Sequence, residues 1–209
     1  MQEHKGTGNL LGVVLCGGES RRMGRDKGLM PVENTTWAQS VAAKLSALGI
    51  PVVISVNPEQ QEAYGKLFPA EQLVVDSLPV DGPILGILSA HEKYPGKDIL
   101  PLACDMIDMD DATLRELLEA YQKDTTSEFI AFHHDGFLQT LGAVYTSRGL
   151  APLLQQAKDG SLKHFSLIRV LDHGTTHRIP VPSRAAFHNY NSRNELTFPE
   201  DDKGQEGKS

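Results

Sequence analysis

Apolar residues in this chain gather in short runs that alternate, as far as Lys123, with segments of helical periodicity. Each run is short and ends at glycine or polar residues, which is typical of strands buried on both faces. The runs are Leu10–Cys16, Pro51–Val56, Leu73–Val75 and Ile99–Cys104. The helical segments are Thr36–Leu48, Ile84–Tyr94 and Ala112–Lys123. This alternation predicts a Rossmann-like, doubly wound α/β fold with a mainly parallel sheet covered on both faces.

The pattern changes after Lys123. Two strand-like segments, Phe129–Phe132 and Phe137–Tyr145, flank Asp135-Gly136, a dipeptide that favours a tight hairpin because both positions tolerate positive φ. We therefore expect an antiparallel excursion at this point of the sheet. Further on, the sequence predicts two helices, a short strand and an Asn-rich turn: Leu150–Lys158, Leu162–Leu171, Arg178–Val181 and Asn189–Asn194.

The 209 residues fit one domain, which we expect to span 10–196. Segments 1–9 and 197–209 are predicted to be disordered ends, since neither carries a run of apolar residues able to anchor it. The first nine residues also lack the apolar region of a secretory signal. Two cysteines are too few for a disulfide framework and suit a reducing compartment, so a cytoplasmic protein is expected.

The charge balance limits the possible partners. The chain has 20 basic and 27 acidic residues, a net charge of −7, which is the wrong sign for a general nucleic-acid or anionic-membrane binder. No apolar run approaches the roughly 20 residues that a spanning helix needs. An anionic ligand must therefore be met by a local cluster of cations, and one cluster exists between Arg21 and Lys27.

That cluster follows the first predicted strand, where doubly wound sheets bind ligands. Gly17 and Gly18 allow close backbone approach and offer N–H groups to an anion, and the cations that follow suit a triphosphate. The spacing excludes a Walker loop and a dinucleotide fingerprint, and it excludes Ser20 as the nucleophile of a G-x-S-x-G elbow. The residues alone leave open that the glycines merely turn the chain.

Three polar residues follow the other predicted strands. Asp105 is the best metal ligand in the sequence, because Mg²⁺ takes one or two protein carboxylates together with phosphate oxygens and water. Its alternative role is a helix cap. Asp76 has a carboxylate of the kind that can pair with the N1–H and amino group of guanine, but the residues alone favour an ordinary loop position, because aspartate is common after strands. Asn57 suits either a ligand contact or a helix cap.

The string from Leu15 to Lys27, Leu-x-Gly-Gly-x-Ser-x-Arg-Met-Gly-x-Asp-Lys, resembles the signature of the nucleotidyltransferases similar to molybdenum cofactor guanylyltransferase. The resemblance continues in the same order along most of the chain, to Leu196. It includes Asn57, Asp76, Asp81-Gly82-Pro83-Ile84-Leu85-Gly86, Cys104-Asp105-Met106 and Phe187-His188-Asn189-Tyr190-Asn191-Ser192.

The resemblance implies a fold of the nucleotide-diphospho-sugar transferase type and transfer of GMP from GTP to the phosphate of molybdopterin. It implies Mg²⁺ on Asp105, with Asn191 or Asn189 as a further ligand, directly or through water. It gives catalytic roles to Lys27, Arg22 and Asp105. The implied partners are GTP, molybdopterin and molybdoenzyme maturation proteins. The implied nucleotide-binding residues are Leu15, Cys16, Gly17, Gly18, Ser20, Lys27, Asn57, Asp76 and Asp105.

Three positions depart from the family pattern. Ile107 replaces a proline, Gln139-Thr140-Leu141 replaces a proline-containing pair, and Ser192-Arg193 replaces Thr-Pro. Lost prolines change the backbone rather than the chemistry, so the pterin side of the pocket is where we expect a difference. Two alternatives stay open: a transferase that uses CTP or a sugar phosphate, and a nucleotide-binding adaptor without catalysis.

Overall fold

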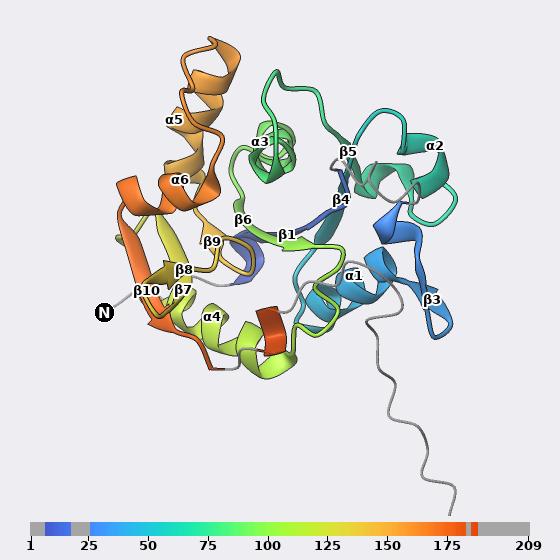
Figure 1. Cartoon of the computed structure of the whole chain (residues 1–209), viewed down its shortest axis with the longest axis horizontal. Coiled ribbons are helices and arrows are strands. Elements are labelled where there is room, and N and C mark those ends of the chain that lie inside the picture. The colour runs from blue at the N-terminus through green and yellow to red at the C-terminus, as the bar shows by residue number, and fades with distance from the viewer. Residues whose placement is uncertain (1–6, 18–25, 183–184, 188–209) are drawn as a thin grey trace, which may run out of the picture.

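A mixed β-sheet forms the centre of the computed structural model, which describes residues 7–17, 26–182 and 185–187 (Figure 1). In this part of the chain eight strands pair in the order β10-β7-β9-β6-β1-β4-β5, with β8 paired to β7. Their bounds are β1 Leu10–Leu15, β4 Val52–Val56, β5 Leu73–Val75, β6 Asp98–Ala103, β7 Phe129–His134, β8 Phe137–Leu138, β9 Val144–Tyr145 and β10 Thr176–Pro180.

The strand directions confirm the predicted fold class. Strands β6, β1, β4 and β5 run parallel to one another, whereas β9 pairs antiparallel with both β6 and β7. Because β9 is antiparallel to both neighbours, β7 again runs in the direction of β6. The fold is therefore α/β with a mainly parallel sheet and an antiparallel excursion.

Helices cover both faces of the sheet (Figure 1). The side chains of α1 and α4 join one apolar cluster, and those of α3, α5 and α6 join the other. Alternate residues of β1 enter the two clusters, Val14 on one side and Val13 on the other, which is why this strand is apolar at nearly every position. The bounds are α1 Trp37–Ala47, α2 Gln61–Tyr64, α3 Pro83–Lys93, α4 Asp111–Lys123, α5 Ser147–Lys158 and α6 Leu167–His173. None of these helices is both long and apolar enough to cross a membrane.

Helix α1 begins with a complete capping box. The Gln39 N–H donates to Thr36 Oγ1 at 3.4 Å, and the Thr36 N–H donates to Gln39 Oε1 at 3.2 Å. Helix α4 is capped by the residue before it, Asp110, whose Oδ1 accepts the Thr113 N–H at 2.7 Å. The cap of this helix is therefore Asp110 and not Asp105.

Two predicted elements were wrong in extent. The strand expected over Phe137–Tyr145 is divided into β8 and β9, because Gly142 turns with φ +67° and donates its N–H to Pro101 O at 2.8 Å. The predicted Asp135-Gly136 turn is present, with positive φ at both residues. The helix expected from Leu162 begins only at Leu167, since Leu162 packs onto the apolar cluster from a loop rather than from a helix.

The sequence missed a small hairpin, β2 Pro31–Val32 with β3 Thr35–Thr36, and the short helix α2. Of the N-terminal segment predicted to be disordered, Thr7–Asn9 forms a 3-10 turn, and residues 1–6 lie outside the described chain. The predicted Asn-rich turn and the tail 197–209 lie outside it as well.

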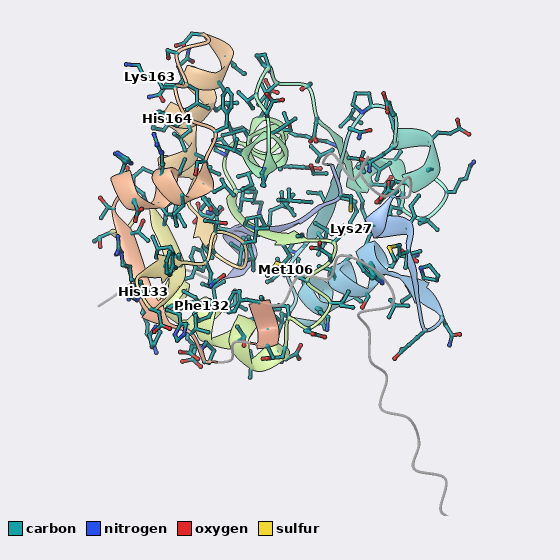
Figure 2. All side chains as sticks on the ribbon, in the orientation of Figure 1. Lys27, Met106, Phe132, His133, Lys163 and His164 are labelled. Atoms are coloured by element: carbon teal, nitrogen blue, oxygen red, sulfur yellow. The ribbon has the colours of Figure 1, made fainter. Side chains whose placement is uncertain are left out.

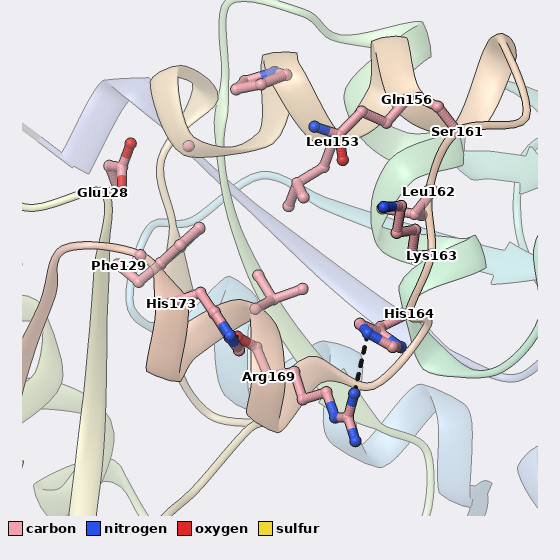
Figure 3. Close-up of a pocket in the computed structure, with 14 residues that line it drawn as sticks. Glu128, Phe129, Leu153, Gln156, Ser161, Leu162, Lys163, His164, Arg169 and His173 are labelled. Atoms are coloured by element: carbon pink, nitrogen blue, oxygen red, sulfur yellow. Dashed lines mark hydrogen bonds between the residues drawn. The ribbon is translucent and has the colours of Figure 1, made fainter.

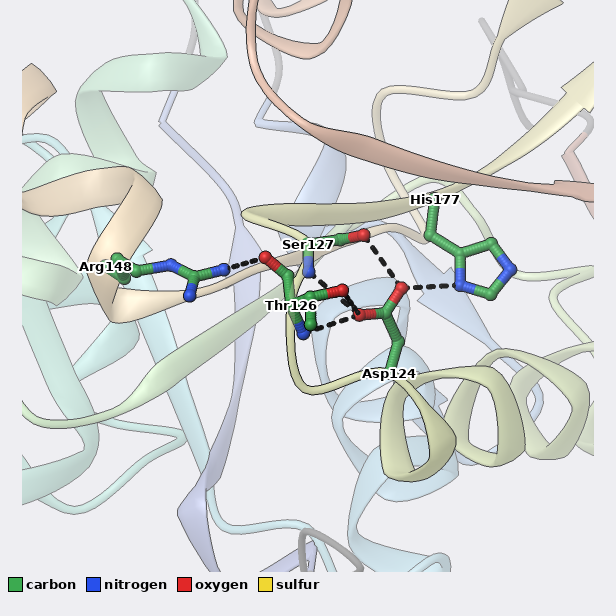
Figure 4. A network of polar contacts seen from close by, with 5 residues as sticks. All are labelled: Asp124, Thr126, Ser127, Arg148 and His177. Atoms are coloured by element: carbon green, nitrogen blue, oxygen red, sulfur yellow. Dashed lines mark hydrogen bonds and ion pairs between the residues drawn. The ribbon is translucent and has the colours of Figure 1, made fainter. Parts of the chain in front are cut away.

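A hydrogen-bond network fixes the end of α4 against the edge of the sheet (Figure 4). Asp124 accepts from the N–H groups of Thr126 and Ser127, both at 2.8 Å, from the Ser127 hydroxyl at 2.7 Å and from His177 Nδ1 at 2.8 Å. Arg148 donates to the Thr126 carbonyl in the same group. Burial by itself raises the pKa of Asp124, but the bonds from Ser127, Thr126 and His177 together hold it well below the usual range.

We expect Asp124→Asn to lower the free energy of unfolding at neutral pH by about 1–3 kcal/mol, because the new amide turns N–H groups toward existing donors. The folded-state pKa lies below the unfolded value, so this stabilisation is present above pH ~4 and is lost as the pH falls toward the folded pKa. Urea unfolding of both proteins between pH 7 and pH ~3 measures it.

The matched control is Asp111→Asn, which removes an exposed carboxylate from the same helix and should change stability by no more than about 0.5 kcal/mol. If the difference in the free energy of unfolding between Asp124→Asn and the parent stays constant over this pH range, the lowered pKa of Asp124 is contradicted.

Candidate functional site

Two adjoining hollows lie at the carboxyl ends of the parallel strands. The Asp76 hollow, about 600 Å³, is lined by Leu15, Gly17, Ser55, Asn57, Asp76, Asp81, Gly82, Pro83, Leu85 and Gly86. The Asp105 hollow, about 300 Å³, is lined by Leu15, Cys16, Gly17, Lys27, Gly82, Pro83, Ala103, Cys104, Asp105 and Leu141. Leu15, Gly17, Gly82 and Pro83 belong to both, so the two form one depression across the ends of β5, β4, β1 and β6.

This depression brings together seven of the residues expected from the sequence: Leu15, Cys16, Gly17, Lys27, Asn57, Asp76 and Asp105. Five others lie outside the described residues, namely Gly18, Ser20, Arg22, Asn189 and Asn191. The convergence follows from the topology, because parallel strands deliver the residues that follow them to the same edge of the sheet.

Lys27 and Asp105 form an ion pair in the lining of the Asp105 hollow. The Lys27 Nζ lies 3.0 Å from Asp105 Oδ2, and the side chains are only 21% and 14% exposed. The two residues are 78 positions apart in sequence. The ion pair therefore fixes a cation and a carboxylate side by side in a place that bulk water reaches only in part.

The segment that carries Lys27 is itself anchored by Asp26. Asp26 Oδ1 accepts from the Gly28 N–H at 3.0 Å and from the Tyr64 hydroxyl at 2.8 Å, and Oδ2 accepts from Gln60 Nε2 at 2.6 Å. Gly28 has no room for a side chain, since a Cβ there would lie 2.1 Å from the Tyr64 hydroxyl oxygen. Burial, with the neighbouring Cys16 and Asp26, raises the pKa of Tyr64, so its hydroxyl stays protonated and donates.

Sequence analysis gave no role to Asp26, Gln60 or Tyr64. Asp26 belongs to the string that carries the family resemblance, and that was the available signal. Its partners come from α2 and the turn before it, elements that the sequence pattern did not reveal.

The Asp76 carboxylate lies close to Ser55 and Gly17 in the wall of the Asp76 hollow. The Ser55 hydroxyl donates to Asp76 Oδ1 at 2.9 Å, and a Cβ on Gly17 would approach Asp76 Oδ2 to 2.6 Å. A Cβ on Gly86 would lie 2.3 Å from Ser55 Oγ, so this glycine leaves the hydroxyl room to make the bond. Burial raises the pKa of Asp76 to about 6, and the Ser55 hydrogen bond offsets part of that rise. The carboxylate is thus fixed in direction and costly to ionise.

Asn57 and Gln60 form a reciprocal pair of hydrogen bonds across the turn before α2, whose N-cap is Gln60. Asn57 Oδ1 accepts the Gln60 N–H at 2.9 Å, and Gln60 Oε1 accepts the Asn57 N–H at 2.9 Å. Gln60 Nε2 also donates to the Cys16 carbonyl at 3.0 Å, which ties this turn to the end of β1. Asn57 therefore shapes the wall of the Asp76 hollow in addition to lining it.

Cys16 and Cys104 are buried free thiols at the ends of β1 and β6. Burial and the contact with Cys104 raise the pKa of Cys16 well above the ordinary value. Cys16 is consequently a neutral thiol. Its backbone is bonded within the protein, since its N–H donates to the Ser55 carbonyl oxygen at 2.9 Å and its carbonyl accepts from Gln60 Nε2 at 3.0 Å.

The donor set fits Mg²⁺ on a nucleotide rather than a metal held by protein alone. No group of three His, Cys, Asp or Glu residues suited to a metal occurs within the described ranges. Asp105 brings a carboxylate to the lining of the hollow, and its Oδ2 accepts from Lys27 at 3.0 Å. One carboxylate with phosphate oxygens and water is a common arrangement for this ion.

Comparison with known proteins places the chain in a family. Residues 12–175 match the MobA-like NTP transferase domain. A probable molybdenum cofactor guanylyltransferase from Opitutus terrae is 34% identical over 72% of this chain and 73% of its own length. A molybdenum cofactor biosynthesis bifunctional protein from Synechocystis is 32% identical over 68% of this chain. The match covers only 40% of the length of that relative.

Among solved structures, molybdopterin-guanine dinucleotide biosynthesis protein A from Archaeoglobus fulgidus has the same fold. The TM-score is 0.71 at 22% identity, over 90% of this chain and 94% of the other. The family match covers both hollows, the Lys27–Asp105 ion pair and the strands other than β10 and the first two residues of β1. The chain therefore belongs to the MobA-like NTP transferase domain family.

Proposed function

We propose that this protein transfers GMP from GTP to the phosphate of molybdopterin, releasing pyrophosphate and forming molybdopterin guanine dinucleotide. The observation that carries the proposal is the Lys27–Asp105 ion pair in a hollow that opens directly into the Asp76 hollow. A cation and a metal-binding carboxylate at one end, and a base-pairing carboxylate at the other, match the two ends of a nucleoside triphosphate. The names of the relatives support the choice of acceptor.

In this proposal Asp76 reads the base. An ionised carboxylate accepts two hydrogen bonds, from N1–H and the amino group of guanine, which adenine and cytosine cannot offer in the same arrangement. Ser55 keeps the carboxylate pointing in one direction, so little ordering remains to be done when the nucleotide binds.

The phosphates lie over the loop that follows β1. The Gly17 N–H donates to the Ser55 carbonyl oxygen at 3.2 Å, so this glycine contributes the room left by its missing Cβ, and the phosphate contacts are assigned to the Gly18 N–H and the Ser20 hydroxyl. An oxygen of the molybdopterin phosphate attacks the α-phosphorus, a new P–O bond forms, and the bond to the β-phosphate oxygen breaks. Lys27 and Arg22 stabilise the negative charge of the departing pyrophosphate, and no covalent enzyme intermediate is needed.

Asp105 is the residue that would hold Mg²⁺, with Asn191 or Asn189 as a further ligand, directly or through water. When bound, Mg²⁺ supplies positive charge to the phosphate oxygens. Asp105 also holds Lys27 at 3.0 Å, so the lysine ammonium is positioned before the nucleotide arrives. Preorganised charge of this kind lowers the cost of reorientation during the reaction.

Pyrophosphate release is the direct test of the proposal. The protein is incubated with Mg²⁺, molybdopterin and either GTP or CTP, and pyrophosphate is followed with a coupled assay. We expect release with GTP that depends on molybdopterin. Release of pyrophosphate with CTP but not with GTP points to the cytidylyl alternative. GTP binding without any release points to a non-catalytic adaptor.

Asp76→Ala should damage base selectivity more than maximal turnover. Removing the carboxylate deletes the contact with the guanine edge, so we expect the preference for GTP over CTP to fall by about 1–3 kcal/mol. The measurement is kcat/KM for both nucleotides with the parent and the variant.

The pH dependence separates base reading from a general packing defect. Because the pKa of Asp76 is about 6, the parent should lose its preference for GTP over CTP as the pH falls below that value. The nucleotide preference of Asp76→Ala should not change with pH. Asp81→Ala, a second carboxylate in the same hollow, is the control and should keep the pH-dependent preference. Equal preferences in the parent and Asp76→Ala rule out this role.

A further inference from the structure

A third hollow, separate from the proposed active site, lies between α5, α6 and the start of β7 (Figure 3). Its volume is about 440 Å³, within the range of small-molecule pockets. Its walls come from α5, from the loop 161–166, from α6 and from the residues at the beginning of β7.

The hollow is far from the proposed active site. The Asp76 and Asp105 hollows lie at the carboxyl ends of the parallel strands, whereas Phe129 is the first residue of β7, which runs in the same direction as β6. The third hollow therefore lies at the opposite end of the sheet, and it shares no lining residue with the other two. Figure 2 shows Lys163 and His164 on a different side of the molecule from Lys27.

The interior of the hollow is mainly apolar. Leu153 extends from α5 toward α6, Leu162 enters from the loop, and Val170 and Phe129 complete the surface. Two glycines let the elements approach the Phe129 ring, since a Cβ on Gly149 or Gly174 would lie 2.7 or 2.3 Å from it. The apolar surface thus depends on close packing around one aromatic ring.

Basic side chains gather at the rim. Lys163, His164, Arg169 and His173 all line the hollow. Arg169 Nη1 lies 3.0 Å from His164 Nε2, and His173 Nδ1 lies 2.8 Å from the Arg169 carbonyl oxygen, so this rim is locally ordered (Figure 3). Neither Lys163 nor Arg169 forms an ion pair with an acidic residue anywhere in the ranges that the structure describes.

One acidic residue lines the same hollow, on the β7 side, so the two cations Lys163 and Arg169 outnumber the carboxylate there. Glu128 Oε2 accepts the Thr175 N–H at 2.8 Å. In a chain with a net charge of −7, cations without acidic partners around an apolar cavity are an electrostatic complement to an anion. Arginine in particular matches the paired oxygens of a phosphate or carboxylate.

We propose that this hollow is a second ligand site, which binds a small anion with an apolar body. Arg169 and Lys163 hold a phosphate or carboxylate head at the rim, and the apolar part lies on Leu153, Leu162 and Val170. The site is independent of the nucleotidyl transfer reaction, because none of its residues belongs to the machinery for that reaction.

Binding to the full-length protein is measured with four probes: hexyl phosphate, hexanoate, inorganic phosphate and 1-hexanol. We expect hexyl phosphate or hexanoate to bind more tightly than inorganic phosphate, which lacks the apolar body, and 1-hexanol, which lacks the charge. The tighter of hexyl phosphate and hexanoate identifies the preferred head group. Amide chemical shifts of the ¹⁵N-labelled protein locate the site, and the changes should include Leu153, Leu162 and Val170.

The variant Lys163→Gln with Arg169→Gln should weaken binding by at least about tenfold, the loss expected for charged hydrogen-bond partners. The matched control Lys66→Gln with Arg115→Gln removes the same charge from exposed positions elsewhere and should bind as the parent does. Equal affinity of the parent and the Lys163/Arg169 variant overturns the proposal. So does binding of 1-hexanol as tight as that of the charged probes, or shift changes confined to Gly17, Lys27 and their neighbours.

Discussion

Replacing Asp105 by Asn should lower nucleotidyl transfer at ordinary Mg²⁺ concentrations by about 100-fold or more. The substitution keeps the volume of the side chain and one oxygen, but it removes the charge that retains a hard divalent cation. It also removes the negative charge that pairs with Lys27 at 3.0 Å, so the ammonium faces a neutral amide in place of a carboxylate. Both changes reduce charge stabilisation around the transferred phosphate.

The experiment is a Mg²⁺ titration of turnover, with thermal unfolding of the same samples. Asp110→Asn is the matched control, because Asp110 caps α4 and asparagine caps a helix as well as aspartate. That variant should keep both stability and Mg²⁺-dependent turnover. Normal turnover of Asp105→Asn at ordinary Mg²⁺ rules out Asp105 as the metal ligand.

Lys27→Ala should slow turnover by about 100- to 1000-fold, the loss typical of removing one preorganised donor to a developing charge. The fold should survive, because the side chain lies at the edge of a hollow and the surrounding segment is held by Asp26 through Gly28, Gln60 and Tyr64. Single-turnover kinetics at saturating GTP measure the chemical step directly.

The control for this variant is Lys66→Ala, a lysine 72% exposed on the surface, which should leave turnover unchanged. Near-parental turnover of Lys27→Ala contradicts the assigned role. Thermal unfolding must also be close to that of the parent, because a general loss of structure would lower turnover for a different reason.

Local pattern was sufficient for the strands and helices that form the nucleotide side of the molecule. Runs such as Leu10–Cys16 are apolar at nearly every position because both faces of the strand are covered, and that requirement is visible in the sequence. Since the carboxyl ends of parallel strands meet at one edge, the positions of Asp76 and Asp105 followed from the order of the elements.

Long-range pairing was not visible in the same way. Strand β10 joins β7 in parallel at the edge of the sheet, although β8, β9 and two helices intervene between them in the chain. The extended run from Phe137 is divided at Gly142, whose N–H donates to Pro101 in β6. Propensity and periodicity describe neighbours in sequence, and these features depend on contacts with distant strands.

The sequence by itself determined the fold class and the strand ends at which Gly17, Asp76 and Asp105 lie, because strand endings are local properties. Only the tertiary structure decided that Lys27 contacts Asp105 across 78 residues, and that Asp26 is held by Gln60 and Tyr64. It also raised the pKa of Asp76 by burial and formed the basic hollow between α5 and α6. Desolvation and distance are properties of the packed chain, and no residue carries them alone.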